Sequence, residues 1–230
     1  SDNIDTPCFT FAEASWDAAL IAGVTSHEVG HTVSLVHQGQ DPGAGGVRQE
    51  YFGGHGTGAL SWSPIMGNGL RPVNQWAKGE YQGANQTQDN LVAIANSTSG
   101  IPPVADDFGD TRDTATFAPG LSTTVGGVIG STADVDMIRI NAGRGNLVIT
   151  PKVSLVAPNL RLQIRVMDAT GKVLGTYVGS GAVGRMAPNP ITVAIPTEGM
   201  HFIELDGIGN GTGVTEGYTE YGSIGSYSLT

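Results

Sequence analysis

His27, Glu28 and His31 constrain this chain more than any other residues, because their spacing has a clear meaning only on a helix. Residues four apart project from one helix face, so two imidazoles can reach one metal ion. A random order of the same residues would give roughly 0.004 matches to the His-Glu-x-x-His pattern, which makes chance a poor explanation. Apolar residues recur at helical spacing between 16 and 36, which predicts one helix over that range.

His37 completes the pattern, because it lies six residues beyond His31 and just outside the helix if the chain turns near Ser34. Zinc accepts imidazole nitrogen, and a catalytic zinc site takes three protein ligands and leaves a fourth position for water. Zinc lowers the pKa of that water and polarises a carbonyl, while Glu28 takes the proton and returns it to the leaving amine. The four residues therefore predict metal-assisted hydrolysis.

Two stretches resemble a known clan. The run HEVGHTVSLVH at 27–37 resembles the HExxHxxGxxH signature of the metzincin zinc endopeptidases, and SPIMG at 63–67 resembles their Met-turn. The resemblance implies one catalytic Zn²⁺, a general base that activates water, and a structural methionine beneath the metal ligands. The residues that match these roles are the ligands His27, His31 and His37, the base Glu28, and the methionine Met66.

The rest of the chain is similar to secreted bacterial metzincins that carry a pre-peptidase C-terminal domain. The similarity lies in WSPIMG at 62–67, NQWAKGEY at 74–81, DDFGDTRDTAT at 106–116, GVIGSTADVDMIRI at 127–140 and YGSIGSYSLT at 221–230. It implies an extracellular protein that acts on protein or peptide substrates.

The sequence departs from the metzincin pattern at two positions. Ser34 stands where the family usually has the glycine of a sharp turn, and a non-glycine residue with positive φ costs about 1 to 2 kcal/mol. Asn68 stands where some metzincins place a tyrosine that steadies the oxyanion. Tyr51 and His55 are the candidates to stabilise the transition state in its place.

The composition changes near residue 100, where Pro, Gly and acidic residues are typical of a linker. We therefore expect a peptidase region over 1–104 and a second domain over 105–230. The first contains the active-site helix, the Met-turn, a short helix over 76–82 and a C-terminal helix over 88–96. The second alternates apolar and polar residues in short runs, as an antiparallel, jelly-roll-like β-sandwich does. Those runs cover 135–140, 146–151, 160–167, 172–178 and 201–205. The expected fold class is thus α+β.

Only about 26 residues precede His27, so the N-terminal sheet of a metzincin catalytic domain is expected to be incomplete, with an upstream segment missing from this chain. Two alternatives to hydrolysis stay open. One is a metal-binding pseudo-peptidase that has lost turnover. The other is a non-enzymatic adhesion or carbohydrate-binding protein that acts through the sandwich.

Charge and hydropathy exclude some partners. The net charge is −10 and no cluster of Lys and Arg is found, which argues against nucleic acid. No apolar run approaches the 18 or so residues of a membrane span. In the second domain, carboxylates stand as candidate oxygen ligands to Ca²⁺, although solvated turn residues would give the same pattern. These are Asp106, Asp107, Asp110, Asp113, Asp134 and Asp136.

Overall fold

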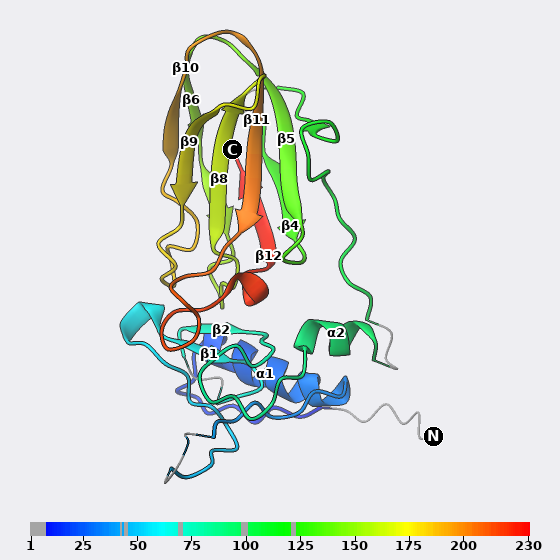
Figure 1. Cartoon of the computed structure of the whole chain (residues 1–230), viewed down its shortest axis with the longest axis vertical. Coiled ribbons are helices and arrows are strands. Elements are labelled where there is room, and N and C mark those ends of the chain that lie inside the picture. Colours follow the sequence, from blue (N-terminus) through cyan, green and yellow to red (C-terminus); the bar gives the residue numbers. More distant parts are fainter. Residues whose placement is uncertain (1–7, 42, 44–45, 69–70, 98–100, 121–122) are drawn as a thin grey trace. The chain divides into compact units, whose positions relative to one another are not determined.

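The computed structural model describes residues 8–230 except 42, 44–45, 69–70, 98–100 and 121–122. It is mostly β-structure with few helices (Figure 1) and divides into two compact units. Unit 1 comprises Ser1–Pro103 and Gly211–Tyr218, and unit 2 comprises Val104–Asn210 and Thr219–Thr230. The sequence analysis assigned all of 105–230 to the second domain, whereas 211–218 groups with unit 1. Residues 98–100 of the expected linker lie outside the described residues.

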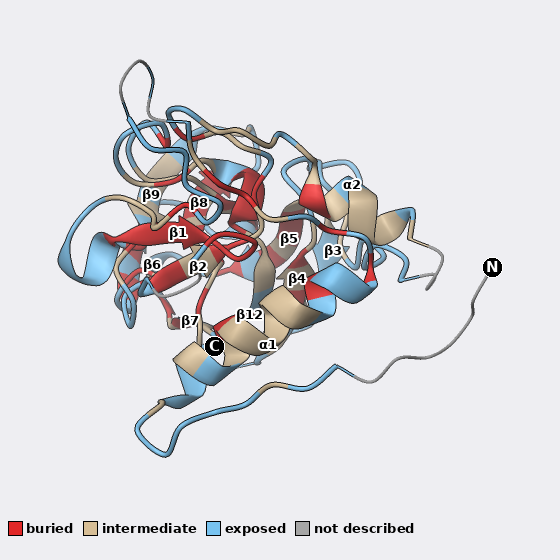
Figure 2. Cartoon of the chain, turned by 90° about the horizontal axis from the view of Figure 1, so that it is seen from below, coloured by how far each residue is buried: buried red, intermediate tan, exposed pale blue. Residues whose placement is uncertain are grey.

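Unit 1 contains two α-helices and one small parallel sheet. Its elements are α1 (Ala18–Thr32), the 3₁₀ turn η1 (Gly58–Leu60), β1 (Trp62–Pro64), β2 (Val73–Gln75) and α2 (Asn90–Ala95). The two short strands are largely buried, whereas α1 is mostly half-buried or exposed (Figure 2). Its only buried residues are Gly23 and Gly30. Irregular backbone fills much of the remainder, as the many glycines predict.

Two predictions about helices are wrong: the bounds of the helix expected over 16–36, and the short helix expected over 76–82. Helix α1 begins after Asp17, whose Oδ1 accepts a hydrogen bond from the Leu20 amide at 2.9 Å, and it ends at Thr32 instead of running over 16–36. Residues 76–82 are not helical. There Gly79 has φ of +78°, and the buried Tyr81 ring stacks on Phe52 at a centroid distance of 4.0 Å. Tertiary packing therefore overrides local helix propensity in this segment.

Unit 2 is built from strands in three sheets. The elements are β3 (Thr116–Phe117), β4 (Val125–Ile129), β5 (Val135–Ala142), β6 (Gly145–Ile149), β7 (Pro151–Val153), β8 (Leu162–Asp168), β9 (Val173–Val178), β10 (Ile191–Ile195), β11 (Gly199–Gly207), the 3₁₀ turn η2 (Glu220–Gly222) and β12 (Gly225–Leu229). The sheets have the orders β3-β5-β11-β8-β9, β4-β12-β7 and β10-β6. Every pair is antiparallel except β3 with β5, which is parallel.

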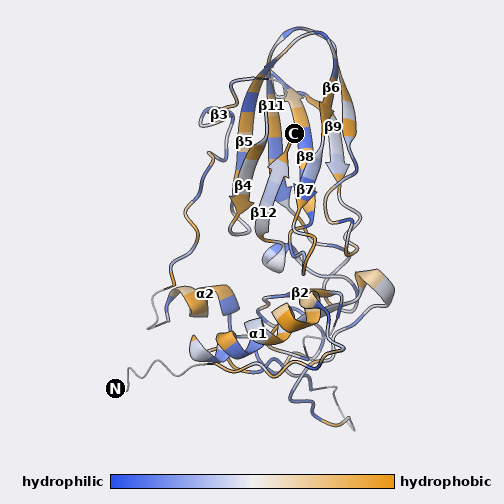
Figure 3. Cartoon of the chain, turned by 180° about the vertical axis from the view of Figure 1, so that it is seen from behind, coloured by the Kyte–Doolittle hydropathy of each residue, from blue (hydrophilic) through white to orange (hydrophobic). Residues whose placement is uncertain are grey.

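The core of unit 2 joins all three sheets. Strands β10 and β8 alternate buried and less buried residues, and Figure 3 shows the mixed hydropathy that results. Ile138 of β5, Val193 of β10 and Leu229 of β12 belong to one buried cluster, so strands of the three sheets pack against each other as a sandwich. A turn at 168–172 joins β8 to β9, and Asp168 Oδ1 accepts hydrogen bonds from the amides of Thr170 and Lys172.

Among the described residues, no helix has both the length and the apolar character that a bilayer crossing requires.

Candidate metal centre

Helix α1 carries His27, Glu28 and His31 in its last two turns. The two histidines lie on one face, with ring centroids 4.9 Å apart. Helical spacing alone therefore brings two imidazoles to one place, as the sequence predicts.

The helix ends in a Schellman turn that reverses the chain. The Leu35 amide donates to the Gly30 carbonyl at 3.0 Å, and the Ser34 amide donates to the His31 carbonyl at 3.2 Å. Ser34 adopts a φ of +71°, the left-handed conformation that the sequence analysis expected of a glycine-like position. The turn sends His37 back towards α1, so that its ring lies 4.8 Å from His31 and 5.3 Å from His27.

Replacing Ser34 by glycine is expected to stabilise unit 1 by about 0.5 to 1 kcal/mol. The positive φ costs about 1 to 2 kcal/mol, and the extra freedom of glycine in the unfolded chain returns part of that gain. All three tryptophans, Trp16, Trp62 and Trp76, belong to unit 1, so the fluorescence-detected melting temperature measures the effect. Ser34→Ala is the matched control and should show no gain. A lower melting temperature for Ser34→Gly would contradict the assignment of strain.

Gln88 fixes the chain just after this turn. Its Nε2 donates to the Ser34 carbonyl at 3.0 Å, and its Oε1 accepts from the Val36 amide at 3.1 Å. Both ends of one side-chain amide are thus used to hold the segment that leads to His37.

Beyond His37 the chain is held by the Met66 turn. The Gln38 amide donates to the Met66 carbonyl at 2.7 Å, and the Gln38 carbonyl accepts from the Phe52 amide at 2.8 Å. The Phe52 carbonyl in turn accepts from the Asn68 amide at 3.0 Å. This ladder ties His37, the segment around Tyr51 and the turn into one frame.

Met66 itself is fully buried and lies beneath the helix. A Cβ added at Gly30 would be 2.6 Å from the Met66 sulfur, so α1 passes over this methionine closely and only a glycine fits. Met66 packs in a buried cluster with Val33, Leu35 and Ile65.

Each of the three histidines uses its Nδ1 in a hydrogen bond. His27 Nδ1 donates to the Ile65 carbonyl at 2.7 Å, and His31 Nδ1 donates to the Leu35 carbonyl at 2.9 Å. His37 Nδ1 lies 2.9 Å from Glu50 Oε1. Carbonyl and carboxylate oxygens only accept, so the proton of each neutral ring is on Nδ1 and the lone pair is on Nε2.

The three rings point their free nitrogens at one another. The Nε2 atoms of His31 and His37 are 3.0 Å apart, and one ring nitrogen of each histidine lies within 4.8 Å of the others. Two lone pairs at that distance repel unless a cation lies between them. Zinc bound tetrahedrally at 2.0 to 2.1 Å separates its nitrogen ligands by about 3.3 Å, so this donor set fits a zinc ion.

Burial lowers the pKa of His27, and the neighbouring His31 and His37 lower it further against the opposing effect of the Ile65 hydrogen bond. The lowered pKa favours the neutral ring near neutral pH. A neutral imidazole is the form that binds a metal.

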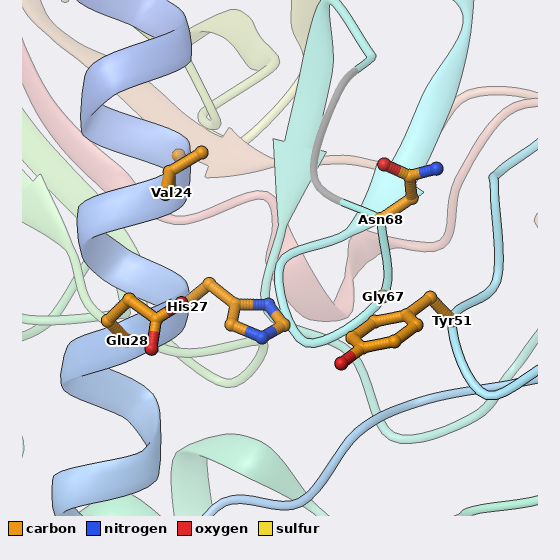
Figure 4. Close-up of a pocket in the computed structure, with 7 residues that line it drawn as sticks. Val24, His27, Glu28, Tyr51, Gly67 and Asn68 are labelled. Atoms are coloured by element: carbon orange, nitrogen blue, oxygen red, sulfur yellow. The ribbon is translucent and has the colours of Figure 1, made fainter. Parts of the chain in front are cut away.

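A cavity of about 320 Å³ opens beside the first histidine (Figure 4). His27 and Glu28 project from α1, and Tyr51 faces them from the opposite side. The Tyr51 ring also lies 4.2 Å from the His37 ring. A phenol and a carboxylate thus share a cavity with His27. The lining residues are Gly23, Val24, His27, Glu28, Tyr51, Gly67 and Asn68.

His55, the other candidate to stabilise a transition state, does not line this cavity. Its Nε2 donates to the Gly217 carbonyl at 2.6 Å, and its backbone pairs with Trp62. The ring lies against Phe52 and Trp62 at centroid distances of 5.9 and 5.3 Å. The structure therefore gives His55 a packing role within unit 1, and only Tyr51 of the two candidates stands at the site.

The carboxylates predicted as calcium ligands gather in unit 2. Ligand oxygens of Asp106, Asp107 and Asp136 lie within 4.8 Å of one another, as do those of Asp106, Asp110 and Asp134. Asp106 belongs to both groups, whereas Asp113 belongs to neither. Two adjacent groups that share one carboxylate form an oxygen-rich site of the kind that calcium prefers.

The cluster is partly buried: Asp136 has no exposed surface and Asp134 is half-buried, whereas Asp106, Asp107 and Asp110 are exposed. One carboxylate oxygen of Asp134 is buried and has no hydrogen-bond partner among the described residues. Burial, together with the charges of Asp134, Asp107 and Asp106, raises the pKa of Asp136 to about 7, and burial also raises that of Asp134. The Tyr227 hydroxyl donates to the Asp136 carboxylate, and this hydrogen bond by itself lowers the pKa of Asp136. A buried carboxylate among other carboxylates lacks the counter-charge that a cation would supply.

No protein-family model and no curated protein sequence matches the chain. Some solved structures do match part of the chain. They include the periplasmic inhibitor of g-type lysozyme, PliG, from Aeromonas hydrophila, with 17% identity over 50% of this chain and 89% of that one and a TM-score of 0.34. The PliG of Salmonella Typhimurium has 14% identity over 49% and 86%, with a TM-score of 0.28.

The pre-peptidase C-terminal domain of the collagenase from Bacillus anthracis also matches. It has 15% identity over 50% of this chain and 92% of that domain, with a TM-score of 0.34. The chain is thus similar to such a domain over half its length. None of these three neighbours is a catalytic zinc-peptidase domain.

Proposed function

We propose that this chain carries the active centre of a secreted zinc endopeptidase of the metzincin type. The observation that carries the proposal is the convergence of three imidazoles. Each holds its Nδ1 proton on an acceptor and turns Nε2 inwards, with the carboxylate of Glu28 beside them. A zinc ion bound there would supply a Lewis acid that polarises a peptide carbonyl and activates water.

The residues of the chain supply the remaining steps. Glu28 accepts the proton of the attacking water and passes it to the leaving amine. Tyr51 can donate a hydrogen bond from its phenol to the oxygen that gains charge, and the amide of Asn68 lines the same cavity. Hydrolysis needs no covalent intermediate in this scheme, because no nucleophilic side chain takes part.

The proposal is tested by zinc content measured together with peptide cleavage. We expect one zinc per chain in the wild type and hydrolysis of casein or a fluorogenic peptide that a chelator removes and added zinc restores. His31→Ala should lose both, because two imidazoles bind zinc far more weakly than three. Thr32→Ala, on the exposed side of the same turn, is the control that should keep both. Zinc without hydrolysis would favour the pseudo-peptidase, and a wild type without zinc would overturn the proposal.

A binding role without catalysis is the alternative, with unit 2 acting in adhesion or carbohydrate recognition. It predicts that ligand binding survives in the variants that lack His27, His31 or His37. The proposal of hydrolysis rests on the geometry of unit 1.

For unit 2 we propose a Ca²⁺ ion held by carboxylates of Asp106, Asp107, Asp110, Asp134 and Asp136. The support is the burial of the Asp136 carboxylate beside the charges of Asp134, Asp107 and Asp106.

A further inference from the structure

Among the described residues, Glu50 is the one side chain that hydrogen-bonds to the Nδ1 of a candidate metal ligand. The Nδ1 atoms of His27 and His31 bond to backbone carbonyls, which no substitution of a side chain removes. His37 instead bonds to Glu50 Oε1 at 2.9 Å. A carboxylate in this position fixes the orientation of the ring. It also makes Nε2 more basic towards a metal than a backbone carbonyl in the same position would.

The backbone around Glu50 is held rigidly against the segment of His37. Gln40 and Gln49 exchange two backbone hydrogen bonds of 2.9 Å, and Phe52 bonds to Gln38 on the other side of Glu50. A Cβ on Gly39 would be 2.6 Å from the Glu50 carbonyl oxygen and 2.1 Å from that of Gln49. The two segments therefore approach closely because glycine occupies position 39.

Asn85 joins the same two segments with its side chain. Its Oδ1 accepts from the Gly39 amide at 3.0 Å, and its Nδ2 donates to the Gln49 carbonyl at 3.2 Å. The carboxylate at 50 thus stands on a fixed frame. An accidental surface ion pair of a mobile loop would lack this support.

We propose that Glu50 is the positioning residue of His37 and sets the affinity of the centre for its metal. The inference rests on the proposed function, because it assumes that His37 is a ligand. Loss of such a partner usually weakens metal binding 10- to 100-fold. The Glu50 side chain is 69% exposed, so water screens its charge and we expect an effect near the lower end.

The test is the zinc dissociation constant of the full chain, measured by competition with a chromophoric chelator. Glu50→Ala should raise it about tenfold, and Glu50→Gln, which keeps an acceptor oxygen without the charge, should raise it less. The cobalt-substituted protein should show a changed ligand-field spectrum in Glu50→Ala. Glu13→Gln, an exposed carboxylate change elsewhere in unit 1, should alter neither readout.

A double-mutant cycle separates positioning of His37 from a general effect of charge. In a His37→Ala background, Glu50→Ala should have no further effect on zinc affinity, because the ring it acts through is gone. Wild-type affinity in Glu50→Ala, or an undiminished effect of Glu50→Ala in the His37→Ala background, would overturn the inference while leaving the zinc site of the wild type in place. A wild type that binds no zinc would overturn the inference and the proposed function together.

Discussion

Glu28→Gln is expected to lower kcat for peptide hydrolysis by about 10²- to 10⁴-fold while zinc stays bound. The amide has nearly the shape of the carboxylate but cannot take a proton from water, and general acid–base catalysis contributes a factor of that size. Glu28 is not one of the three converging ligands, so its change leaves the imidazoles and their Nδ1 bonds intact. Kinetics with a fluorogenic peptide and zinc analysis of the same sample measure the two effects together.

Glu13→Gln is the matched control, since it makes the same chemical change on the exposed surface of unit 1. It should keep wild-type kcat and zinc content. Full activity in Glu28→Gln would exclude this carboxylate as the base and would point to a contaminating peptidase. Loss of zinc from Glu28→Gln would mean that the carboxylate binds the metal, which contradicts the role proposed for it.

The histidines could be predicted from the sequence because their geometry is local. A four-residue spacing on a helix determines the relation of His27 to His31, and a positive φ at Ser34 is enough to return His37. The partners of the rings could not be predicted in the same way. Glu50 is 13 residues from His37, and the Ile65 carbonyl is 38 residues from His27, so both contacts depend on how irregular loops pack.

The choice between Tyr51 and His55 shows the same limit. Both lie in a glycine-rich stretch without periodicity, so sequence patterns offered no means of separating them. The structure separates them through a distant contact, because Gly217 accepts the His55 ring nitrogen. Residues 211–218 also group with unit 1, and no shift in composition sets this segment apart from its neighbours.

In unit 2 the long strands followed from alternation of apolar and polar residues. The structure finds β5, β8, β9 and β11 at the predicted runs within a few residues. The two-residue strand β3 carries no periodic signal, and its parallel pairing with β5 could not be predicted. The sequence named the members of the acidic cluster, but burial of Asp136 was decided by its place on β5.

Calcium is expected to raise the melting temperature of unit 2 by up to about 10 °C. A ligand at 100 times its dissociation constant stabilises the folded state by about 2.7 kcal/mol, and each kcal/mol shifts a domain of this size by a few degrees. Calorimetry of the full chain measures both transitions, and tryptophan fluorescence identifies that of unit 1. The transition of unit 2 should move with calcium but not with an equal ionic strength of sodium chloride.

The direction in which the stability of unit 2 changes with pH follows from the raised pKa of Asp136. Its folded-state pKa of about 7 lies above its ordinary value of 3.8, so the folded state keeps a proton that the unfolded state releases. The stability from this group is present in full below about pH 3.8 and is lost as pH rises towards and through 7. Without calcium, unit 2 should therefore melt at a lower temperature at pH 8 than at pH 5. Calcium binds the ionised carboxylates, so its stabilising effect should be larger at pH 8.

Asp136→Asn should raise the melting temperature of unit 2 relative to the wild type without calcium and lower it relative to the wild type with calcium. Without calcium at pH 8 the variant should melt at a higher temperature than the wild type, because the amide removes a buried charge whose charged neighbours are the carboxylates of Asp134, Asp107 and Asp106. With calcium the wild type should gain and the variant should not, because the ion loses its most buried ligand. Asp113→Asn, an exposed aspartate outside both carboxylate groups, should respond to calcium as the wild type does. A full calcium response in Asp136→Asn would rule out this cluster as the calcium site. A general destabilisation of the fold would lower the melting temperature both with and without calcium, so it would not produce the expected difference.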